Sequence, residues 1–579
     1  MGLEVFLTSQ KHLTSGNFMT LEQLFASHDL AVLSPEISLA VFAMLVLLAG
    51  AFFDARVQKT VLPLLALAGV GVAGAGTASL WNRGLLFGPS SSAIFVADNF
   101  SLFFKGIFLL GLGVSVLLSG RFTSARTGDR MAVEGEFLGL MMLSTVGMMF
   151  VASARDLLVV FLGIETLSIA LYVLAGFART RRLSNEAALK YFLLGAFATG
   201  FLLYGIALTY YSVGSTSLPV IAERLANGAI RSQSVLYVGL ALLLIGLGFK
   251  AALVPFHQWT PDVYEGSPTP VTAFMATGAK AAAFAALMRV FGGAFIGLAP
   301  QLHPFLMVLA VLTMTVGNVI ALSQDSIKRM LAYSSIAHAG YLLIGVLAAS
   351  SATFRGQTLE AQSATAAVLF YLLCYALMNL GAFAVLVFLE NRRSDGLRES
   401  STRFGEDGTI RVGISPNDAF DSEDANLRLS DLAGLGWHQP MMAAMLTLFL
   451  LSLAGIPPLA GFFGKLAIFN AAIGQGMWGL VLVGAVNTVI SVYFYLRPVV
   501  AMYMNADAEE TVPSSVLVSA PSNDSMVVAG EGAATTARPL ALPLGALFAV
   551  ILCAIAVAAM FVLQTVALTW AQQATTILK

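Results

Sequence analysis

Charged residues are scarce in this sequence. Asp, Glu, Lys and Arg make up 11% of its 579 residues, whereas hydrophobic residues make up 58%. A soluble domain usually has about a quarter of its residues charged, so this chain has too little charge to cover a water-soluble particle. Its net charge is -1 and no basic patch is visible, which argues against a nucleic-acid partner. The bilayer must therefore be the solvent for most of the chain.

Cysteine and the common cofactor motifs are also lacking. The two cysteines, Cys374 and Cys553, both lie within apolar runs. They are too few and too far apart to suggest a disulfide framework or a metal site, and we expect them to be small core residues. The sequence has no phosphate-cradling glycine loop, no dinucleotide fingerprint and no paired CxxC motif. We therefore expect that the chain itself binds no NADH, flavin or iron–sulfur cluster.

Long apolar runs, by contrast, are abundant. A helix that spans the bilayer needs roughly 20 mostly apolar residues. About fourteen such runs occur, and they are too long and not alternating in the manner of a closed barrel. The sequence thus predicts an all-α, polytopic membrane protein with helices near 35–53, 61–80, 99–119, 136–153, 156–177, 187–211, 236–254, 269–293, 303–323, 333–350, 364–390, 441–472, 479–502 and 540–566.

Two polar, irregular segments interrupt the apolar runs and divide the chain. The segment 391–437 is rich in Asp, Glu, Arg, Ser and Gly, and 504–538 is rich in Ala, Ser, Thr and Pro. The first residues lack the pattern of a signal peptide. We expect an N-terminal extension at 1–34, helices 1–11 at 35–390, a polar cytoplasmic loop at 391–437, helices 12–13 at 438–503, a flexible linker at 504–538 and a last membrane helix at 539–579.

The loops differ in their positive charge, and this difference predicts the orientation. The loops after odd-numbered helices hold most of the Lys and Arg residues, whereas the other loops hold scattered single ones. The positive-inside rule then makes the odd-numbered loops cytoplasmic and leaves both termini outside. The odd-numbered loops contain Arg56, Lys59, Arg121, Arg126, Arg130, Arg179, Arg181, Arg182, Lys328, Arg329, Arg392, Arg393, Arg398 and Arg403.

Four ionisable residues lie in the middle of separate apolar runs: Glu165, Lys250, Lys280 and Lys465. A charge at the centre of a membrane helix costs from about 2.5 kcal/mol upward. Packing alone does not explain why four charged residues are present at such positions. Burial favours the neutral form of lysine, which can then exchange a proton near neutral pH, whereas a nearby carboxylate favours the ammonium form. We therefore hypothesise that Glu165 pairs with Lys250 and that separation of the pair releases a proton.

Other charged residues lie nearer to the helix ends. Lys190 is about two turns into the sixth helix, and Arg289 is near the end of the eighth. For both, a side chain that snorkels to the membrane surface is an equal alternative to a role in transport. For Lys105 and Arg497 the snorkelling or structural interpretation is the better one.

Proline and glycine predict that two of the helices are broken. Pro255 follows Lys250 in the seventh helix, and Gly455, Pro457 and Pro458 precede Lys465 in the twelfth. Proline removes a backbone donor, which membrane depth tolerates only where protein or water covers the break. Broken helices at matching positions of two halves are typical of transporters with inverted repeats. We expect helices 4–8 and 9–13 to be these repeats, with the broken helix fourth in each.

Two histidines are further candidates. His338 lies in an apolar helix near Ser334 and Ser335. It is either a hydrogen-bonded structural histidine or a relay between Lys280 and Lys465, because histidine titrates near neutrality. His257, close to Pro255, is expected to shape the cytoplasmic mouth.

Several segments resemble one family of membrane proteins. KAALVPFHQWTPDVYEGSPTPVTAFM at 250–275 resembles the signature of the antiporter-like subunits of NADH–quinone oxidoreductase, and its PDVYEG stretch is similar to the N-type subunit rather than to L or M. EAALKYFLLGAF at 186–197, KRMLAYSSIAHAGY at 328–341 and LAGIPPLAGFFGK at 453–465 resemble the same subunit. The two long polar segments are atypical of the family.

The resemblance implies roles for individual residues. Glu165 would be the glutamate of the fifth helix, and Lys250 the lysine of the seventh that pairs with it. Lys280 would be the central lysine of the eighth helix, Lys465 the lysine of the twelfth near the exit, and Lys190 the lysine of the sixth. A lysine at 465 is similar to the N and L subunits and unlike M.

The resemblance also implies a setting. The chain would move protons in a bacterial inner membrane, while NADH, FMN, iron–sulfur clusters and quinone would be bound by other subunits. Its partners would be the antiporter-like subunit M, small membrane subunits and lipid. A subunit of a cation/proton antiporter or of a membrane-bound hydrogenase-type complex is the alternative, since these share the broken helices and buried lysines. A structural subunit that has lost transport is a third.

Overall fold

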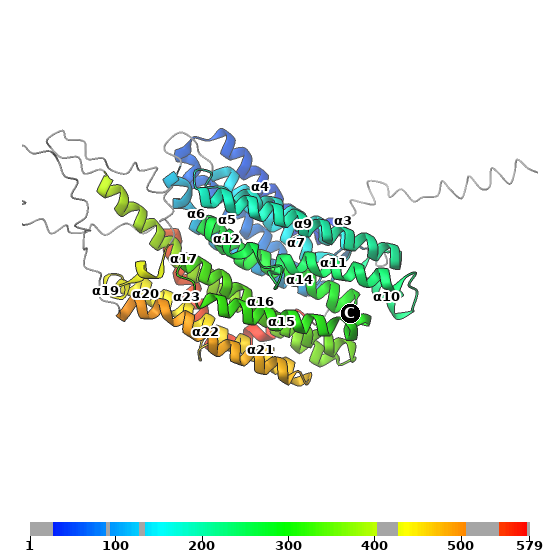
Figure 1. The fold of residues 1–579 in the computed structure, drawn as a ribbon. Helices are drawn as coiled ribbons and strands as arrows, with labels where there is room; N and C mark the ends of the chain where they lie inside the picture. The colour runs from blue at the N-terminus through cyan, green and yellow to red at the C-terminus, as the bar shows by residue number, and fades with distance from the viewer. Residues whose placement is uncertain (1–26, 89–92, 127–133, 402–426, 505–543, 576–579) are drawn as a thin grey trace, which may run out of the picture.

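Helices that lie side by side make up almost all of the described structure. The computed structural model describes residues 27–88, 93–126, 134–401, 427–504 and 544–575. Most of the helices run between the two ends of the molecule in Figure 1. We call the end with the loops after odd-numbered helices, such as the one between α8 and α9, the inner end. The opposite end, with α10 and the loop between α16 and α17, is the outer end.

The helices confirm the predicted all-α membrane architecture. Thirteen described helices are long and apolar enough to span a membrane, and the shorter pair 440–454 and 460–474 supplies a fourteenth, broken span. The first described helices of the chain are α3 Ser27–Val32, α4 Ser34–Phe52, α5 Ala55–Ser79, α6 Asn99–Arg126, α7 Glu134–Ser153, α8 Leu157–Ala175 and α9 Arg182–Val213. A short antiparallel hairpin at the outer end, β1 Leu85–Phe87 and β2 Phe95–Ala97, pairs Leu86 with Val96.

The remaining elements hold Lys250, Lys280, His338 and Lys465. They are α10 Leu218–Ala226, α11 Gln233–Ala251, α12 Trp259–Gly266, α13 Thr269–Phe274, a π-helical turn Met275–Ala279, α14 Lys280–Arg289, a second π-helical turn Val290–Ala294, a 3-10 turn Ile296–Leu298, α15 Ala299–Ala321, α16 Ile327–Phe354, α17 Thr358–Ser401, a 3-10 turn Leu429–Leu432, α19 Leu435–His438, α20 Pro440–Ala454, α21 Ala460–Gly474, α22 Trp478–Met504 and α23 Leu544–Gln573.

Some predicted segments differ from the structure or lie outside it. Helix α17 continues to Ser401, past the predicted start of the polar loop at 391. Three ranges lie outside the described residues: 1–26, 402–426 and 505–543. They contain most of the predicted N-terminal extension, the centre of the polar loop and nearly all of the linker 504–538. The division into these segments stays a prediction.

Both predicted helix breaks are present. Helix α11 ends at Ala251 and α12 begins at Trp259, and α20 ends at Ala454 before α21 begins at Ala460. The breaks belong to the seventh and twelfth spans. Because these are five spans apart, they cross the membrane in opposite directions, as inverted repeats require.

Small residues let the helices of each half approach closely. A Cβ atom at Gly147 of α7 would lie 2.5 Å from the backbone nitrogen of Leu167 in α8. A Cβ atom at Gly340 of α16 would lie 2.7 Å from the backbone nitrogen of Met314 in α15. Such contacts are how membrane helices gain packing energy without a hydrophobic driving force between them. They hold α8 and α16, which carry Glu165 and His338, at fixed positions.

The most buried helices form the centre of the protein. Nearly all residues of the span 269–294 are buried, as are most residues of α16 and of the described part of α17, whereas only about a third or fewer of the residues in the apolar stretches of α4, α5, α9 and α22 are buried. The π-helical turn Met275–Ala279 comes directly before Lys280. Such turns are rare and are frequent at functional sites. The candidate site lies around this central span.

Candidate functional site

Lys250 lies at the first helix break, among aromatic rings. It is in the last turn of α11 and is 5% exposed. Its Nζ atom lies 3.3 Å from the hydroxyl of Tyr191, to which it donates, and 4.8 Å and 5.2 Å from the ring centres of Tyr191 and Tyr172. Ring faces stabilise a cation that has lost its water. Helices α8 and α9, which supply the two tyrosines, thus form a pocket for the ammonium.

Glu165, the predicted partner of Lys250, forms no ion pair with it in this conformation. Among the residues that the structure describes, no ion pair within 4.0 Å joins Glu165 and Lys250. The Oε1 atom of Glu165 is buried and has no hydrogen-bond partner in the described part of the chain. The pairing of these two residues therefore stays a prediction, and the tyrosines hold Lys250 here.

Lys280 begins α14 in the most buried span and is 2% exposed. Its ammonium donates to both the backbone oxygen and the hydroxyl of Ser335 in α16. It also lies 5.5 Å from the ring centre of Tyr375 in α17. The hydroxyls of Tyr264 and Ser335 are 3.5 Å apart. Lys280 thus has neutral oxygen partners, which leave it able to lose its proton.

His338 lies between two tyrosine hydroxyls. One ring nitrogen, Nδ1, is hydrogen-bonded to Tyr371, and the other, Nε2, is 3.1 Å from the hydroxyl of Tyr495. Tyr495 is also hydrogen-bonded to Ser334. The histidine is 1% exposed. With a hydrogen-bonding hydroxyl on each nitrogen, it can accept a proton on one side and release one on the other.

Lys465 is held by the second helix break. Its Nζ atom donates to the backbone oxygens of Leu453, at 3.2 Å, and Ala454, at 2.9 Å. These oxygens belong to the C-terminal end of α20, where the break leaves carbonyls without partners and the helix dipole favours a cation. The ring of Tyr341 lies 4.9 Å from the ammonium. The break therefore creates the site of this lysine.

These groups form one buried line, which we call the central line: Lys280, Ser335, His338, Tyr371, Tyr375, Tyr341 and Lys465. The ring of His338 is 5.2 Å from that of Tyr375, which faces Lys280, and 5.9 Å from that of Tyr341, which faces Lys465. Aromatic rings connect Lys250 to the same line, since Tyr191 stacks on Trp259 at 4.6 Å and Trp259 lies 6.3 Å from Tyr264.

Lys190 is not part of the central line. Its side chain is 41% exposed and lies 2.6 Å from the carboxylates of both Glu186 and Asp262. Arg329 lies 2.7 Å from Asp262 and 2.9 Å from Glu265. A cavity of about 660 Å³ at this inner end is lined in part by Glu265. Lys190 thus belongs to an exposed network of opposite charges at the inner end.

The sequence did not identify most of the partners. Ser335, Tyr371, Tyr375 and Tyr495 were not singled out, although Ser335 was noted beside His338. Nothing distinguishes a tyrosine of the central line from other membrane tyrosines before the helices are packed. Arg497, for which a snorkelling or structural interpretation was favoured, donates to the backbone oxygen of Leu322 at 2.7 Å. In the described part of the chain, no group of three or more His, Cys, Asp or Glu residues could hold a metal ion.

Comparison with known proteins decides the family. A sequence profile described as NADH:quinone oxidoreductase/Mrp antiporter, TM matches residues 154–491. The NADH-quinone oxidoreductase subunit N of Trichlorobacter lovleyi is 44% identical over 488 residues, which cover 84% of this chain and 90% of that protein. This chain belongs to the NADH-quinone oxidoreductase subunit N family.

Solved structures agree with membership of the subunit N family. A chain of respiratory complex I from Thermus thermophilus with bound aureothin is 34% identical, with a TM-score of 0.66, and the match covers 92% of this chain and 98% of that one. A chain of the Mrp complex from Dietzia has a TM-score of 0.69 at 22% identity, over 93% of this chain and 97% of that one. The second likeness shows the fold alone, so it does not favour the antiporter interpretation.

Proposed function

We propose that this subunit N family member translocates protons in NADH–quinone oxidoreductase. The observation that carries the proposal is the central line, in which His338 lies between the rings that face Lys280 and Lys465. Protons approach through the charges around Lys190 and pass Lys250, where Glu165 tunes the charge. They continue through Lys280 and His338 and leave from Lys465. The predicted orientation makes this a movement from the cytoplasm to the outside.

Proton translocation needs a source of energy, since moving one charge across a membrane takes about 2.3 kcal/mol per 100 mV. We propose that NADH, FMN, iron–sulfur clusters and quinone react elsewhere in the complex. The partners that transmit the energy are other membrane subunits, including subunit M and small subunits, in the bacterial inner membrane.

Deleting this chain from its host is expected to abolish NADH-driven acidification of inverted membrane vesicles. The reason is that the energy of NADH oxidation can move protons only through an assembled membrane arm. ATP-driven acidification of the same vesicles, which does not use this complex, is the control and should remain. Fluorescence of a pH-sensitive acridine dye measures both.

The deletion also tests the antiporter interpretation. If NADH-driven acidification is unchanged while proton exchange driven by a sodium gradient is lost, the chain is an antiporter subunit and the proposal is wrong. This function is the alternative that the sequence leaves open, since antiporter subunits share the broken helices and buried lysines.

A further inference from the structure

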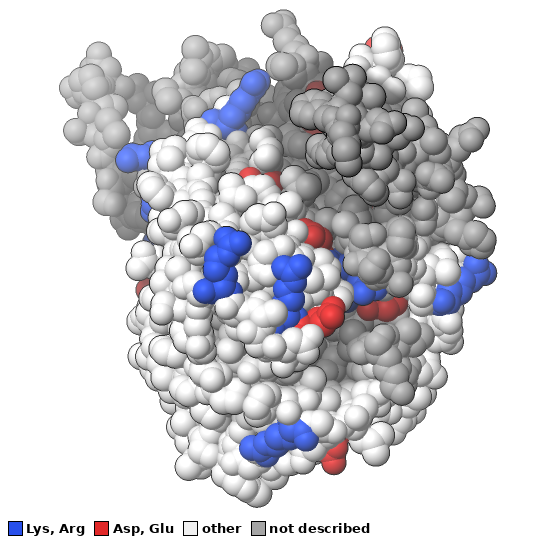
Figure 2. All heavy atoms as spheres, turned by 90° about the vertical axis from the view of Figure 1, so that its right-hand side faces the viewer, with Lys and Arg blue, Asp and Glu red and all other residues white. Residues whose placement is uncertain are grey.

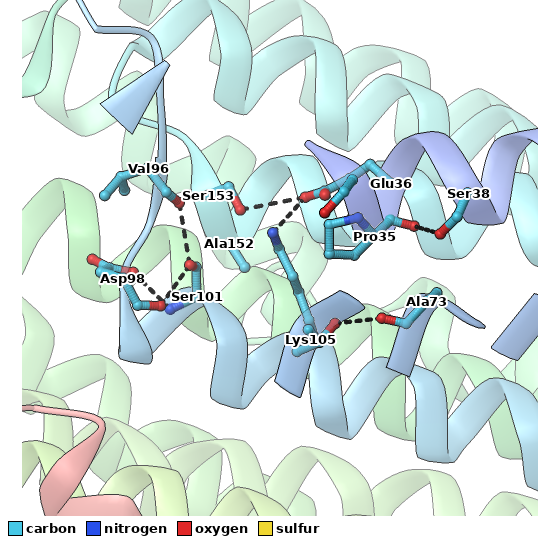
Figure 3. Close-up of polar contacts among 12 residues, drawn as sticks. Pro35, Glu36, Ser38, Ala73, Val96, Asp98, Ser101, Lys105, Ala152 and Ser153 are labelled. Atoms are coloured by element: carbon cyan, nitrogen blue, oxygen red, sulfur yellow. Dashed lines mark hydrogen bonds and ion pairs between the residues drawn. The ribbon is translucent and has the colours of Figure 1, made fainter. Parts of the chain in front are cut away.

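A buried ion pair lies outside the central line, at the outer half of the molecule. The Nζ atom of Lys105 in α6 is 2.7 Å from Oε1 of Glu36 in the first turn of α4. The two side chains are 0% and 1% exposed. In Figure 3 they point toward each other between the helices, and Ser153 of α7 reaches the same carboxylate, with its hydroxyl 3.5 Å away. The sequence favoured a snorkelling or structurally paired side chain for Lys105; the side chain is paired and does not reach the surface.

A structural role explains this pair poorly. Replacing a buried ion pair with apolar residues of similar volume is often neutral or stabilising, so such a pair is weak evidence for stability. Ionisable groups inside a membrane protein are functional candidates for that reason. The second carboxylate oxygen of Glu36, Oε2, is buried and has no hydrogen-bond partner in the described part of the chain. Glu36 therefore keeps an oxygen that is able to take a proton.

The pair is close in depth to Lys280. A Cβ atom at Gly111 of α6 would lie 3.3 Å from the hydroxyl of Thr277, in the turn before α14. Gly111 and Thr277 therefore lie at the same depth in the molecule. Lys105 precedes Gly111 by six residues and Lys280 follows Thr277 by three. At about 1.5 Å per residue, and with the helices running in opposite directions, Lys105 lies about one helical turn nearer to the outer end than Lys280.

The pair also lies beside a cavity at the outer end. The cavity has a volume of about 550 Å³, and its lining includes Asp98, Ala154 and Arg289. Ala154 directly follows Ser153, which contacts Glu36. Arg289 donates to Asp98 at 2.8 Å and to the backbone oxygen of Ala152 at 2.6 Å. Figure 2 shows basic and acidic side chains scattered over a mostly uncharged surface at the outer end.

We propose that Glu36 and Lys105 form a second proton-release site, which connects the central line with the outer cavity. This inference rests on the proposed function. Lys280 loses one proton, the Glu36 carboxylate gains it on Oε2, and the same proton then leaves past Ser153 toward Asp98 and the cavity. Lys105 keeps its ammonium throughout and favours the return of Glu36 to the anionic form.

Variants of the pair in the assembled complex test this inference. Glu36→Gln and the double variant Glu36→Gln/Lys105→Met are expected to slow NADH-driven acidification of inverted vesicles at least about threefold, because neither can accept a proton at this site. Glu36→Asp should keep most of the rate. Glu223→Gln, which changes an exposed carboxylate of α10 at the same end, is the matched control and should behave as the wild type. Native gels report assembly.

The double variant separates a proton site from a structural pair. A structural pair predicts that removing both charges restores the wild-type rate, and that result would overturn the inference. If the double variant does not assemble, Ser153→Ala decides, since it leaves the pair intact; the inference expects a rate at least about twofold lower, and an unchanged rate contradicts it. Lys280→Met is measured alongside, because a normal rate there would instead contradict the proposed function.

Discussion

Lys280→Met is expected to leave the complex assembled while NADH-driven acidification falls about tenfold or more. Methionine fills a similar volume but has no ammonium. The hydrogen bonds that Lys280 donates to the backbone oxygen and the hydroxyl of Ser335 are therefore lost. Removal of a positioned proton carrier typically costs about 10²-fold or more in the rate of the step it serves. Other slow steps of the complex reduce the observed effect. The measurement is dye quenching in inverted vesicles, together with the rate of NADH oxidation.

Folding cannot account for such a loss. Removing an unpaired buried ammonium relieves a desolvation cost, and the Ser335 hydroxyl can turn to a carbonyl of its own helix. The expected stability of the variant is therefore equal to or above that of the wild type. Arg182→Met, at an exposed position at the inner end, is the control. An assembled Lys280→Met complex that acidifies vesicles at the wild-type rate would show that Lys280 carries no proton.

Gly455→Val is expected to reduce acidification several-fold through the position of Lys465. Gly455 has a φ of +87°, and a side chain in this region costs about 1–3 kcal/mol. In addition, its Cβ atom would lie 3.1 Å from Cδ and 3.2 Å from Nζ of Lys465. The larger valine would push the ammonium away from the carbonyls of Leu453 and Ala454. The same vesicle assay measures the effect.

A second glycine separates the two causes. Gly476 has a φ of +74°, and a Cβ atom there would meet nothing within 4 Å. Gly476→Val therefore introduces similar backbone strain without contact to Lys465 and should keep most of the activity. Equal losses in the two variants would mean that strain alone is responsible, and the proposed support of Lys465 by the break would be wrong.

The sequence predicted the membrane helices because each depends on a local property. Twenty apolar residues are enough to form a spanning helix, and Pro255 and Pro457 each remove a backbone donor from their own segment of the chain. The same runs predicted that Lys250, Lys280 and Lys465 lie inside spanning helices. These three lysines are at most 5% exposed.

The partners of those residues depend on packing between distant helices and were not predictable. Lys280 meets Ser335, 55 residues away, and no periodicity connects them. Glu36 lies in the first turn of its helix, where an acidic residue is favourable at the helix N-terminus, so it gave no signal. Lys190 lies within a long apolar helix, but its exposure depends on where Asp262 and the inner loops fold.

The most direct test of the central claim is the rate of NADH-driven acidification in vesicles that carry His338→Gln. Glutamine can still exchange hydrogen bonds with Tyr371 and Tyr495 but cannot take up a proton at neutral pH. If the central line carries protons through His338, the assembled variant acidifies vesicles several-fold more slowly than the wild type. An assembled variant with the wild-type rate would mean that His338 is a structural histidine, and that protons do not pass between Lys280 and Lys465 by this line.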